Sequence, residues 1–318
     1  MRFFKNANYQ FIEKRRAAYV VSSIALLVGI GAMIFNIVSI GNWQNYGVDF
    51  TGGVLVQVSF NQDVEAGQLR SALGGAQAPA ISRFGEDNEY TVRSPLRDGV
   101  EVEVIASELE ARIADAFGEG TFQIVRTEVV GPTIGAELQQ KAAGAILFSL
   151  LLTLIYIAIR FEFRFGVAAV VATLHDIMIT LGLLALFQVE IALTTVAALL
   201  TIVGYSLNDT IVVFDRIREN QNRKGGRKED QVLLLDRSIN EVLPRTILTS
   251  GTTLAVLLAL LILGGAVIRD FTLVLILGVL IGTYSSIFVA SPVLLEIRER
   301  FAEKDPKEKK PRRAPATV

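Results

Sequence analysis

The sequence has no cysteine and a single histidine, His175, among its 318 residues. The lack of cysteine excludes disulfide bonds, thiolate metal sites and thiol nucleophiles, and one histidine alone argues against a histidine-based metal centre. A phosphate-binding GxxxxGKS or GxxxxGKT loop and a GxSxG nucleophile motif are both absent. The net charge of −1 gives the chain no overall electrostatic footprint for nucleic acid. We therefore expect no enzyme, no metal or cofactor and no nucleic-acid partner.

Long apolar runs are what the sequence contains instead. Hydrophobic residues make up 51% of the chain, and they are concentrated in runs long enough to cross a bilayer, for which about 20 residues suffice. The first run lacks a small-residue cleavage site at its end, so we expect a retained helix and not a cleaved signal peptide. The runs predict six membrane-spanning helices: Ala17–Val38, Ala142–Ile159, Gly166–Phe187, Ile191–Phe214, Ile247–Val267 and Phe271–Leu295.

Lysine and arginine are distributed unevenly between the two sides that these helices define. They are concentrated in segment 1–16, in a loop at about 216–245 and in the tail 298–318, which ends in a basic, proline-containing stretch. Cytoplasmic segments of membrane proteins are enriched in these residues. The pattern predicts that both termini lie in the cytoplasm and that segment 39–141 lies outside it. The tail after Phe301 is expected to be a disordered topology anchor.

Segment 39–141 is long enough for one small domain with its own core. Alternating apolar and polar residues predict a strand at 54–60 and another at 121–130, and apolar residues at helical spacing predict a helix at 102–117. A shorter helix and two short strands are expected between them. The order β-α-β-β-α-β is the ferredoxin-like arrangement. The predicted fold class is thus a polytopic α-helical membrane protein of six transmembrane helices, 17–38 and five within 142–297, with one α+β ferredoxin-like extracytoplasmic domain between the first two helices.

Polar side chains interrupt three of the predicted spans. They are His175 and Asp176 in the third, Tyr205, Ser206, Asn208 and Asp209 in the fourth, and Arg245 with Thr249, Thr252 and Thr253 at the start of the fifth. An ionised aspartate inside a bilayer costs about 2.5–3.5 kcal/mol on insertion scales. Acids in such positions usually face an ion or substrate path.

Structural roles stay open for each of these groups. Asp209 can instead form a buried ion pair with Arg245 or a hydrogen bond between helices. The His175–Asp176 pair suits a satisfied hydrogen-bonding role in a bundle core equally well, and the threonines suit tolerated polar packing. Gly278, Gly282 and Ser286 recur every four residues, which predicts close helix packing in the sixth span.

Five stretches together resemble one known family. They are GVDFTGG at 47–53, VGPTIG at 130–135, LHD at 174–176, GYSLNDTIVVFDRIREN at 204–220 and RTILTSGTTL at 245–254. In these stretches the chain resembles the SecF family of protein-export membrane subunits, part of the SecD/SecF family and of the resistance-nodulation-division superfamily. The resemblance runs from the first span to the sixth.

The resemblance implies a role in the bacterial plasma (inner) membrane. A separate SecD chain would complete a twelve-helix unit that uses the proton-motive force to finish export of preproteins released by SecY, SecE, SecG and the ATPase SecA. It places Asp209, Arg245, Asn208 and Ser206 in the proton pathway, with His175, Asp176 and Thr249 as further candidates.

The same resemblance, with the turn-forming glycines, implies a structural motif of Gly47, Asp49, Gly52, Gly53, Gly131, Pro132 and Gly135. The coupling ion is expected to be a proton, with sodium left open, because a carboxylate beside hydroxyl groups binds either. Two alternatives are a half-size proton-driven efflux transporter of the same superfamily and an assembly scaffold whose buried charges only fix helix register. The transporter would need a larger outside segment with an aromatic pocket.

Overall fold

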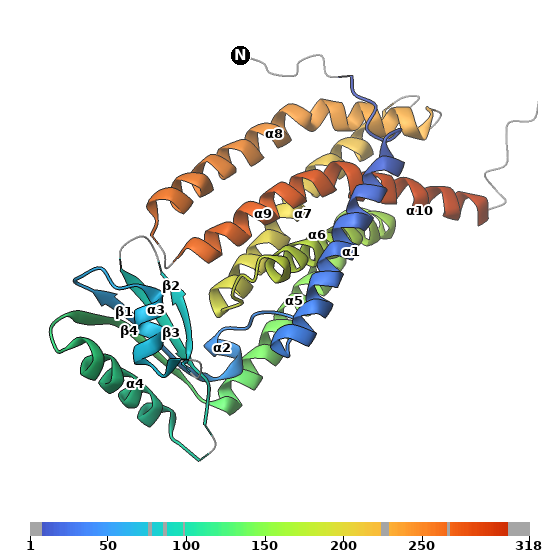
Figure 1. The fold of residues 1–318 in the computed structure, drawn as a ribbon. Helices are drawn as coiled ribbons and strands as arrows, with labels where there is room; N and C mark the ends of the chain where they lie inside the picture. The colour runs from blue at the N-terminus through green and yellow to red at the C-terminus, as the bar shows by residue number, and fades with distance from the viewer. Residues whose placement is uncertain are drawn as a thin grey trace, which may run out of the picture.

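A bundle of long helices carries a small α/β domain at one end (Figure 1). The computed structural model describes residues 8–75, 78–84, 88–97, 99–223, 229–265 and 268–304. The bundle contains α1 (Arg15–Ile40), α5 (Pro132–Arg160), α6 (Phe163–Leu186), α7 (Leu193–Asn222), α8 (Gln231–Leu263) and α9 (Arg269–Ser285), which continues through a π-helical turn (Ser286–Ala290) into α10 (Ser291–Lys304). Six helices are long and apolar enough to cross a membrane, so the predicted number of spans is confirmed.

The helices divide into an inner and an outer set. More of the apolar stretch is buried in α6, α7 and the α9–α10 helix than in α1, α5 and α8. The outer helices expose large apolar side chains, among them Leu27, Leu147 and Leu263, which are 68%, 67% and 83% exposed. Such an apolar outer surface is expected of helices that face lipid. Asp176 and Asp209, the two acids expected inside spans, lie on the inner helices α6 and α7.

Helices α7 and α8 extend beyond the predicted spans and take up most of the loop expected at about 216–245. The extension of α8 is amphipathic, because Leu235, Ile239 and Leu243 recur at helical spacing and are buried. Asp230 caps its start by accepting hydrogen bonds from the amides of Val232 and Leu233 at 2.9 and 3.2 Å. The chain before α1 is fixed to this extension: the Asn240 side chain pairs with the backbone of Tyr9, and Asp236 accepts from the amide of Ile12. The polar loop of the prediction is therefore largely a helix, whereas the membrane boundaries stay a prediction.

Glycines allow α1 and α6, and α7 and α9, to approach closely. A Cβ added to Gly29 on α1 would lie 2.8 Å from the Cα of Gly182 on α6, so the two backbones touch. On α9, a Cβ at Gly278 would collide with the Ile202 side chain of α7 at 2.2 Å, and one at Gly282 would lie 3.0 Å from Ser206. The close packing predicted for this face of the sixth span is confirmed at both glycines.

The α/β domain follows α1 and the short helix α2 (Val48–Thr51). Its sheet has the order β2-β3-β1-β4, with each neighbouring pair antiparallel. This is the ferredoxin-like topology, so the predicted fold class is confirmed. The elements in chain order are β1 (Gly53–Phe60), α3 (Ala66–Ala72), β2 (Ala80–Arg83), β3 (Glu89–Ser94), α4 (Val102–Phe117) and β4 (Phe122–Val130).

The strands place apolar residues on one face of the sheet and polar residues on the other. On β1, Val54, Val56 and Val58 are fully buried against the two helices, while Gln57 belongs to the opposite face, which is turned toward the bundle. This alternation is the period of two expected of a half-covered strand. Gly53 pairs with Val130 in the β1–β4 ladder, so the chain enters and leaves the domain at neighbouring positions.

Candidate functional site

Two carboxylates are buried in the core of the bundle, Asp176 on α6 and Asp209 on α7. They are 0% and 2% exposed. Helical spacing explains their direction, because Thr173, Asp176 and Thr180 share the buried face of α6 and Ser206 and Asp209 share the buried face of α7. Both acids therefore point into protein and not into lipid.

Asp176 is the centre of a hydrogen-bonded network that joins four helices. Its Oδ2 accepts from the hydroxyls of Ser206 on α7 at 2.5 Å and Ser285 on α9 at 2.7 Å. Its Oδ1 lies 2.9 Å from His175 Nδ1, and His175 Nε2 lies 3.0 Å from the hydroxyl of Ser22 on α1. The carboxylate is well satisfied by these neighbours. Ser206, which the sequence grouped with Asp209, is thus a partner of Asp176.

Asp209 has far fewer partners. Its Oδ2 accepts one hydrogen bond, from the Ser250 hydroxyl on α8 at 3.3 Å. Ser250 in turn lies 2.7 Å from Thr283 Oγ1 on α9 and accepts from the Tyr205 hydroxyl at 3.3 Å. An ionised carboxylate has about four acceptor positions. Within the part of the chain that the structure describes, Asp209 is therefore a buried acid with fewer hydrogen-bond partners than Asp176.

Arg245 and Asn208 lie on the outer surface of the bundle. Both residues are exposed, although they belong to helices that cross the membrane. In the described part of the chain no ion pair joins Arg245 to Asp209, and the arginine acts on the acid only through longer-range attraction. The direct pairing suggested by the sequence is not formed within this chain. Thr249 donates to backbone carbonyls of its own helix at 3.0 Å, as Thr252 and Thr253 also do.

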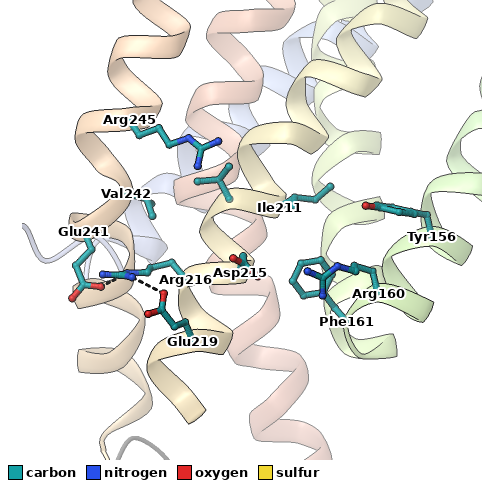
Figure 2. A pocket seen from close by; sticks show the side chains of 11 residues that line it. Tyr156, Arg160, Phe161, Ile211, Asp215, Arg216, Glu219, Glu241, Val242 and Arg245 are labelled. Carbon is teal, nitrogen blue, oxygen red and sulfur yellow. Dashed lines mark hydrogen bonds and ion pairs between the residues drawn. The ribbon is translucent and has the colours of Figure 1, made fainter. Parts of the chain in front are cut away.

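An open cavity of about 570 Å³ lies between α5, α7 and α8, on the side predicted to be cytoplasmic (Figure 2). Arg245 forms one end of its lining, and Asp215 and Arg160 lie further along. Arg216 bridges two carboxylates there, with nitrogen–oxygen distances of 2.5 Å to Glu219 and 2.5 Å to Glu241. The cavity gives Arg245 access to water from that side.

The glycine-rich motif forms the junction between the domain and the bundle. Asp49 caps α7 by accepting a hydrogen bond from the Leu193 amide at 2.8 Å. Gly52 and Gly53 have φ angles of +72° and +129°, which favour glycine. A Cβ at Gly135 on α5 would lie 2.9 Å from the carbonyl oxygen of Phe50, so this helix packs directly on α2. The close backbone approach that the sequence suggested is present, whereas the capping role of Asp49 was not anticipated.

The start of α5 carries the other two residues of the predicted structural motif. Pro132 is the first residue of α5 and Gly131 is its N-cap, in extended conformation. A proline is well tolerated in the first helical turn, where its missing amide has no intrahelical acceptor. In the ranges that the structure covers, no three His, Asp or Glu side chains are grouped so that they could hold a metal ion.

Sequence reasoning missed four hydroxyl groups of these networks: Ser285 and Ser250, which donate to the two acids, and Ser22 and Thr283, which contact His175 and Ser250. Each has other hydroxyl-bearing residues beside it in the sequence, and small polar residues in membrane helices also occur as simple packing positions. The one available signal is the recurrence of small residues every three or four positions along α9, which marked the helix face but not the hydrogen bonds.

Two family descriptions match the chain. "Protein export membrane protein SecD/SecF, C-terminal" matches residues 110–300, and "SecD/SecF GG Motif" matches residues 45–64. Proteins named "Protein translocase subunit SecF" are similar over most of their length. That of Gemmatimonas aurantiaca is 45% identical, with 96% of this chain and 92% of the relative covered, and that of Vibrio alginolyticus is 44% identical, with 90% and 89% covered.

Solved structures agree with this similarity. The crystal structure of SecDF from Thermus thermophilus, a translocon-associated membrane protein, superposes with a TM-score of 0.80 at 38% identity over 94% of this chain. A structure titled as the super-membrane-facing form of SecDF gives a TM-score of 0.66 over 96% of this chain. This chain spans 40% of the length of each of those proteins. From the motifs, the fold and these matches together, the chain belongs to the SecF group of the SecD/SecF family of multi-pass protein-export membrane proteins.

Proposed function

We propose that this chain acts with a SecD partner to use the proton-motive force in the late steps of preprotein export, and that Asp209 carries the proton. The observation that supports this role is the contrast between the two buried acids. Asp176 is held by three side chains, whereas Asp209 has a single hydrogen bond of 3.3 Å. An acid with so few fixed partners can change its protonation state without dismantling the bundle.

Arg245 supplies the electrostatic control in this proposal. A cation near a carboxylate favours its ionised form, and removal of the cation favours the protonated form. Arg245 lies on α8 five residues before Ser250, the hydrogen-bond donor to Asp209, and faces the water-accessible cavity. Alternate approach and withdrawal of the guanidinium would load and unload the proton. Each charge that crosses a potential of 100 mV supplies about 2.3 kcal/mol.

The exposed polar face of α7 and α8 is the proposed SecD contact. Asn208 and Arg245 are exposed on membrane-spanning helices, where polar groups normally face protein or a water-filled cavity. A second helical bundle placed on this face would cover both residues. SecY, SecE, SecG and SecA are proposed as the wider assembly, and the translocating preprotein as the substrate. The role is one of transport in the bacterial plasma membrane and not of catalysis.

Orientation has a direct test, because the chain contains no cysteine. We propose that both termini are cytoplasmic and that the α/β domain faces outward. Ser71 in the domain and Asn222 at the end of α7 are both exposed. An impermeant thiol reagent added to intact cells should label Ser71→Cys and not Asn222→Cys. The reverse pattern would invert the topology.

Preprotein translocation into vesicles that carry this chain, SecD, the translocon and SecA tests the proton role of Asp209. Asp209→Asn keeps the shape and removes the titratable charge, so the variant should assemble with SecD and lose the stimulation by an imposed proton gradient. Glu299→Gln, which neutralises an exposed carboxylate on α10, is the matched control and should respond like the parent.

The alternatives predict different results in the same assay. A scaffold role predicts that Asp209→Asn still responds to the gradient, which would remove Asp209 as the carrier and make Asp176 the next candidate. Stimulation of the parent by a sodium gradient in place of a proton gradient would show that the coupling ion is sodium.

A further inference from the structure

The α/β domain is attached to the bundle at the segment that joins α6 to α7. The chain leading into the domain pairs with this segment like a strand, with Gly47 donating its amide to the Ile191 carbonyl at 2.9 Å and Ile191 donating to the Asn45 carbonyl at 2.8 Å. The sheet itself reaches the same segment through a side chain: Arg93 on β3 forms an ion pair of 2.8 Å with Glu190. The ion pair between Glu190 and Arg93 therefore links the bundle to the domain.

This ion pair is largely shielded from water. The side chains of Arg93 and Glu190 are 18% and 20% exposed, and Arg93 Nε is buried with no hydrogen-bond partner among the described residues. Glu190 Oε1 lies only 2.4 Å from the position that a Cβ of Gly47 would take, so the glycine leaves the space in which the carboxylate sits. Both partners line a cavity of about 440 Å³ between the open face of the sheet and the end of the bundle that carries the domain.

Other charged groups face the same cavity from every neighbouring element. They are Asp49 on α2, Arg83 on β2, Arg126 and Glu128 on β4, and Arg269 and Asp270 on α9. Burial raises the pKa of Glu190 above that of an ordinary glutamate, the attraction of Arg93 opposes the rise, and the negative charges of Asp270 and Asp49 add to it. Arg93 thus compensates only part of the cost of keeping Glu190 ionised in the docked arrangement.

We infer that Glu190 is a second proton-binding carboxylate of this chain, and that its contact with Arg93 sets the position of the domain on the bundle. Separation of the domain would expose Glu190 to water and return its pKa toward that of an ordinary glutamate. Because the docked state binds the proton more tightly than the separated state, docking takes up a proton and is strengthened at low pH. Docking weakens as the pH rises through the docked-state pKa of Glu190, and separation releases a proton from the carboxyl group into the surrounding water.

The link to export depends on the proposed function, whereas the contact and its proton exchange do not. Separation of the domain at the outer end of the bundle would release a proton on the outward side, far from Asp209. Movement of the domain would then be coupled to proton uptake and release at a site that water reaches directly.

Distance measurements on the full chain in lipid nanodiscs test this inference. Cysteines introduced at Asn42, after α1, and at Ser107, on α4, are both exposed and lie outside the cavity lining. Nitroxide labels at these two sites report the position of the domain relative to the bundle. The parent should show the docked distance at pH 5 and a growing population of longer distances toward pH 9.

Variants of the ion pair separate the two parts of the inference. Arg93→Gln leaves ionised Glu190 without its cation, so the docked population should be lost at pH 8 and return at pH 5, which also shows that the variant is folded. Glu190→Gln, and the double variant with Arg93→Gln, should remain docked at every pH. Arg97→Gln removes an exposed ion pair with Glu108 in the same domain and serves as the control, with the parent's response.

Two results would overturn the inference. One is a docked population at pH 8 that Arg93→Gln leaves unchanged, because the contact would then not hold the domain. The other is an unaltered pH response in Glu190→Gln, because another group would then bind the proton. Asp209→Asn should keep the parent's distance response, so failure of the Asp209 proposal in the transport assay and failure of this inference are separate outcomes.

Discussion

The domain and the bundle of this chain are held together by different kinds of core. In the domain, the fully buried side chains are apolar, as at Val56, Leu69 and Ile113, and the Tyr90 hydroxyl is satisfied by the Val64 carbonyl. In the bundle, the core includes two groups of hydrogen-bonded polar side chains, one around Asp176 and one around Asp209. In the domain, the hydrophobic effect drives apolar side chains out of water and into the core. Lipid offers no such drive between helices, so close packing and hydrogen bonds decide which helices meet.

The largest effect is expected in the apolar core of the domain. A fragment of residues 39–141 should fold alone without metal or nucleotide. Ile113 on α4 is 0% exposed, and its replacement by alanine should lower the free energy of unfolding of this fragment by about 2–5 kcal/mol. Urea unfolding followed by circular dichroism measures the change. Ser107→Ala on the exposed face of α4 is the control, and equal destabilisation by both changes would show that Ile113 does not belong to the core of the domain.

Close helix packing predicts the next largest effect, in the bundle. Gly29→Ala would force α1 away from the backbone of Gly182, at a cost of about 1–3 kcal/mol typical of overpacking. Gly31, two residues further on the same helix, has no atom within 4 Å of an added Cβ. Gly31→Ala should therefore leave the thermal stability of the purified protein in detergent unchanged while Gly29→Ala lowers it. If Gly29→Ala leaves the thermal stability unchanged, the contact between Gly29 and Gly182 does not stabilise the bundle.

A smaller difference should separate the two buried acids. Asp176→Asn puts an amide where three donors now converge, and hydrogen bonds between membrane helices average about 0.6 kcal/mol each, so the loss should be about 1–2 kcal/mol. Asp209→Asn disturbs one bond of 3.3 Å and should cost less than Asp176→Asn. Thermal unfolding in detergent ranks the two variants. A larger loss for Asp209→Asn would contradict the division between a structural and an exchangeable carboxylate.

The smallest effect is expected at the surface of the domain. A hydrogen bond from Arg97 lowers the pKa of Glu108, with the positive charges of Arg97 and Arg112 acting in the same direction. A lowered pKa in the folded state contributes stability at neutral pH that is lost as the pH falls through it. Arg97→Gln should return the pKa of Glu108 toward its ordinary value, as followed by NMR titration. The unfolding midpoint at pH 7 should not change measurably, because exposed ion pairs contribute little.

The sequence was sufficient for the fold because each element has a local signal. Alternation at residues 54–60 and helical spacing at residues 102–117 predicted the domain, and the apolar runs predicted the spans. The extension of α8 was predicted as a loop because its polar residues conceal the buried face of Leu235, Ile239 and Leu243. The overall polarity of a segment distinguishes membrane-spanning segments from segments in water, but it does not distinguish an amphipathic helix from a loop.

Only part of the candidate site could be predicted from the sequence, because its contacts join distant parts of the chain. Asp176 meets Ser285 across 109 positions, and His175 meets Ser22 across 153. Nothing local distinguishes those serines from packing residues. Arg245 shows the opposite difficulty: opposite charges on neighbouring helices suggested a pair, yet the arginine is exposed and lines the open cavity, and among the described residues no ion pair joins it to Asp209.

The pairing of Gly53 with Val130 has a consequence for the history of this architecture. Antiparallel partners lie about 4.5–5.5 Å apart at their Cα atoms. The domain therefore begins and ends at adjoining positions, between residues 41–52 on one side and the start of α5 on the other. A module with adjoining ends can be gained, lost or exchanged for another without a change in the length or direction of the helices that flank it. One helical framework can in this way carry different modules through evolution, each requiring a new fit where it meets the α6–α7 connection, α5 and α9.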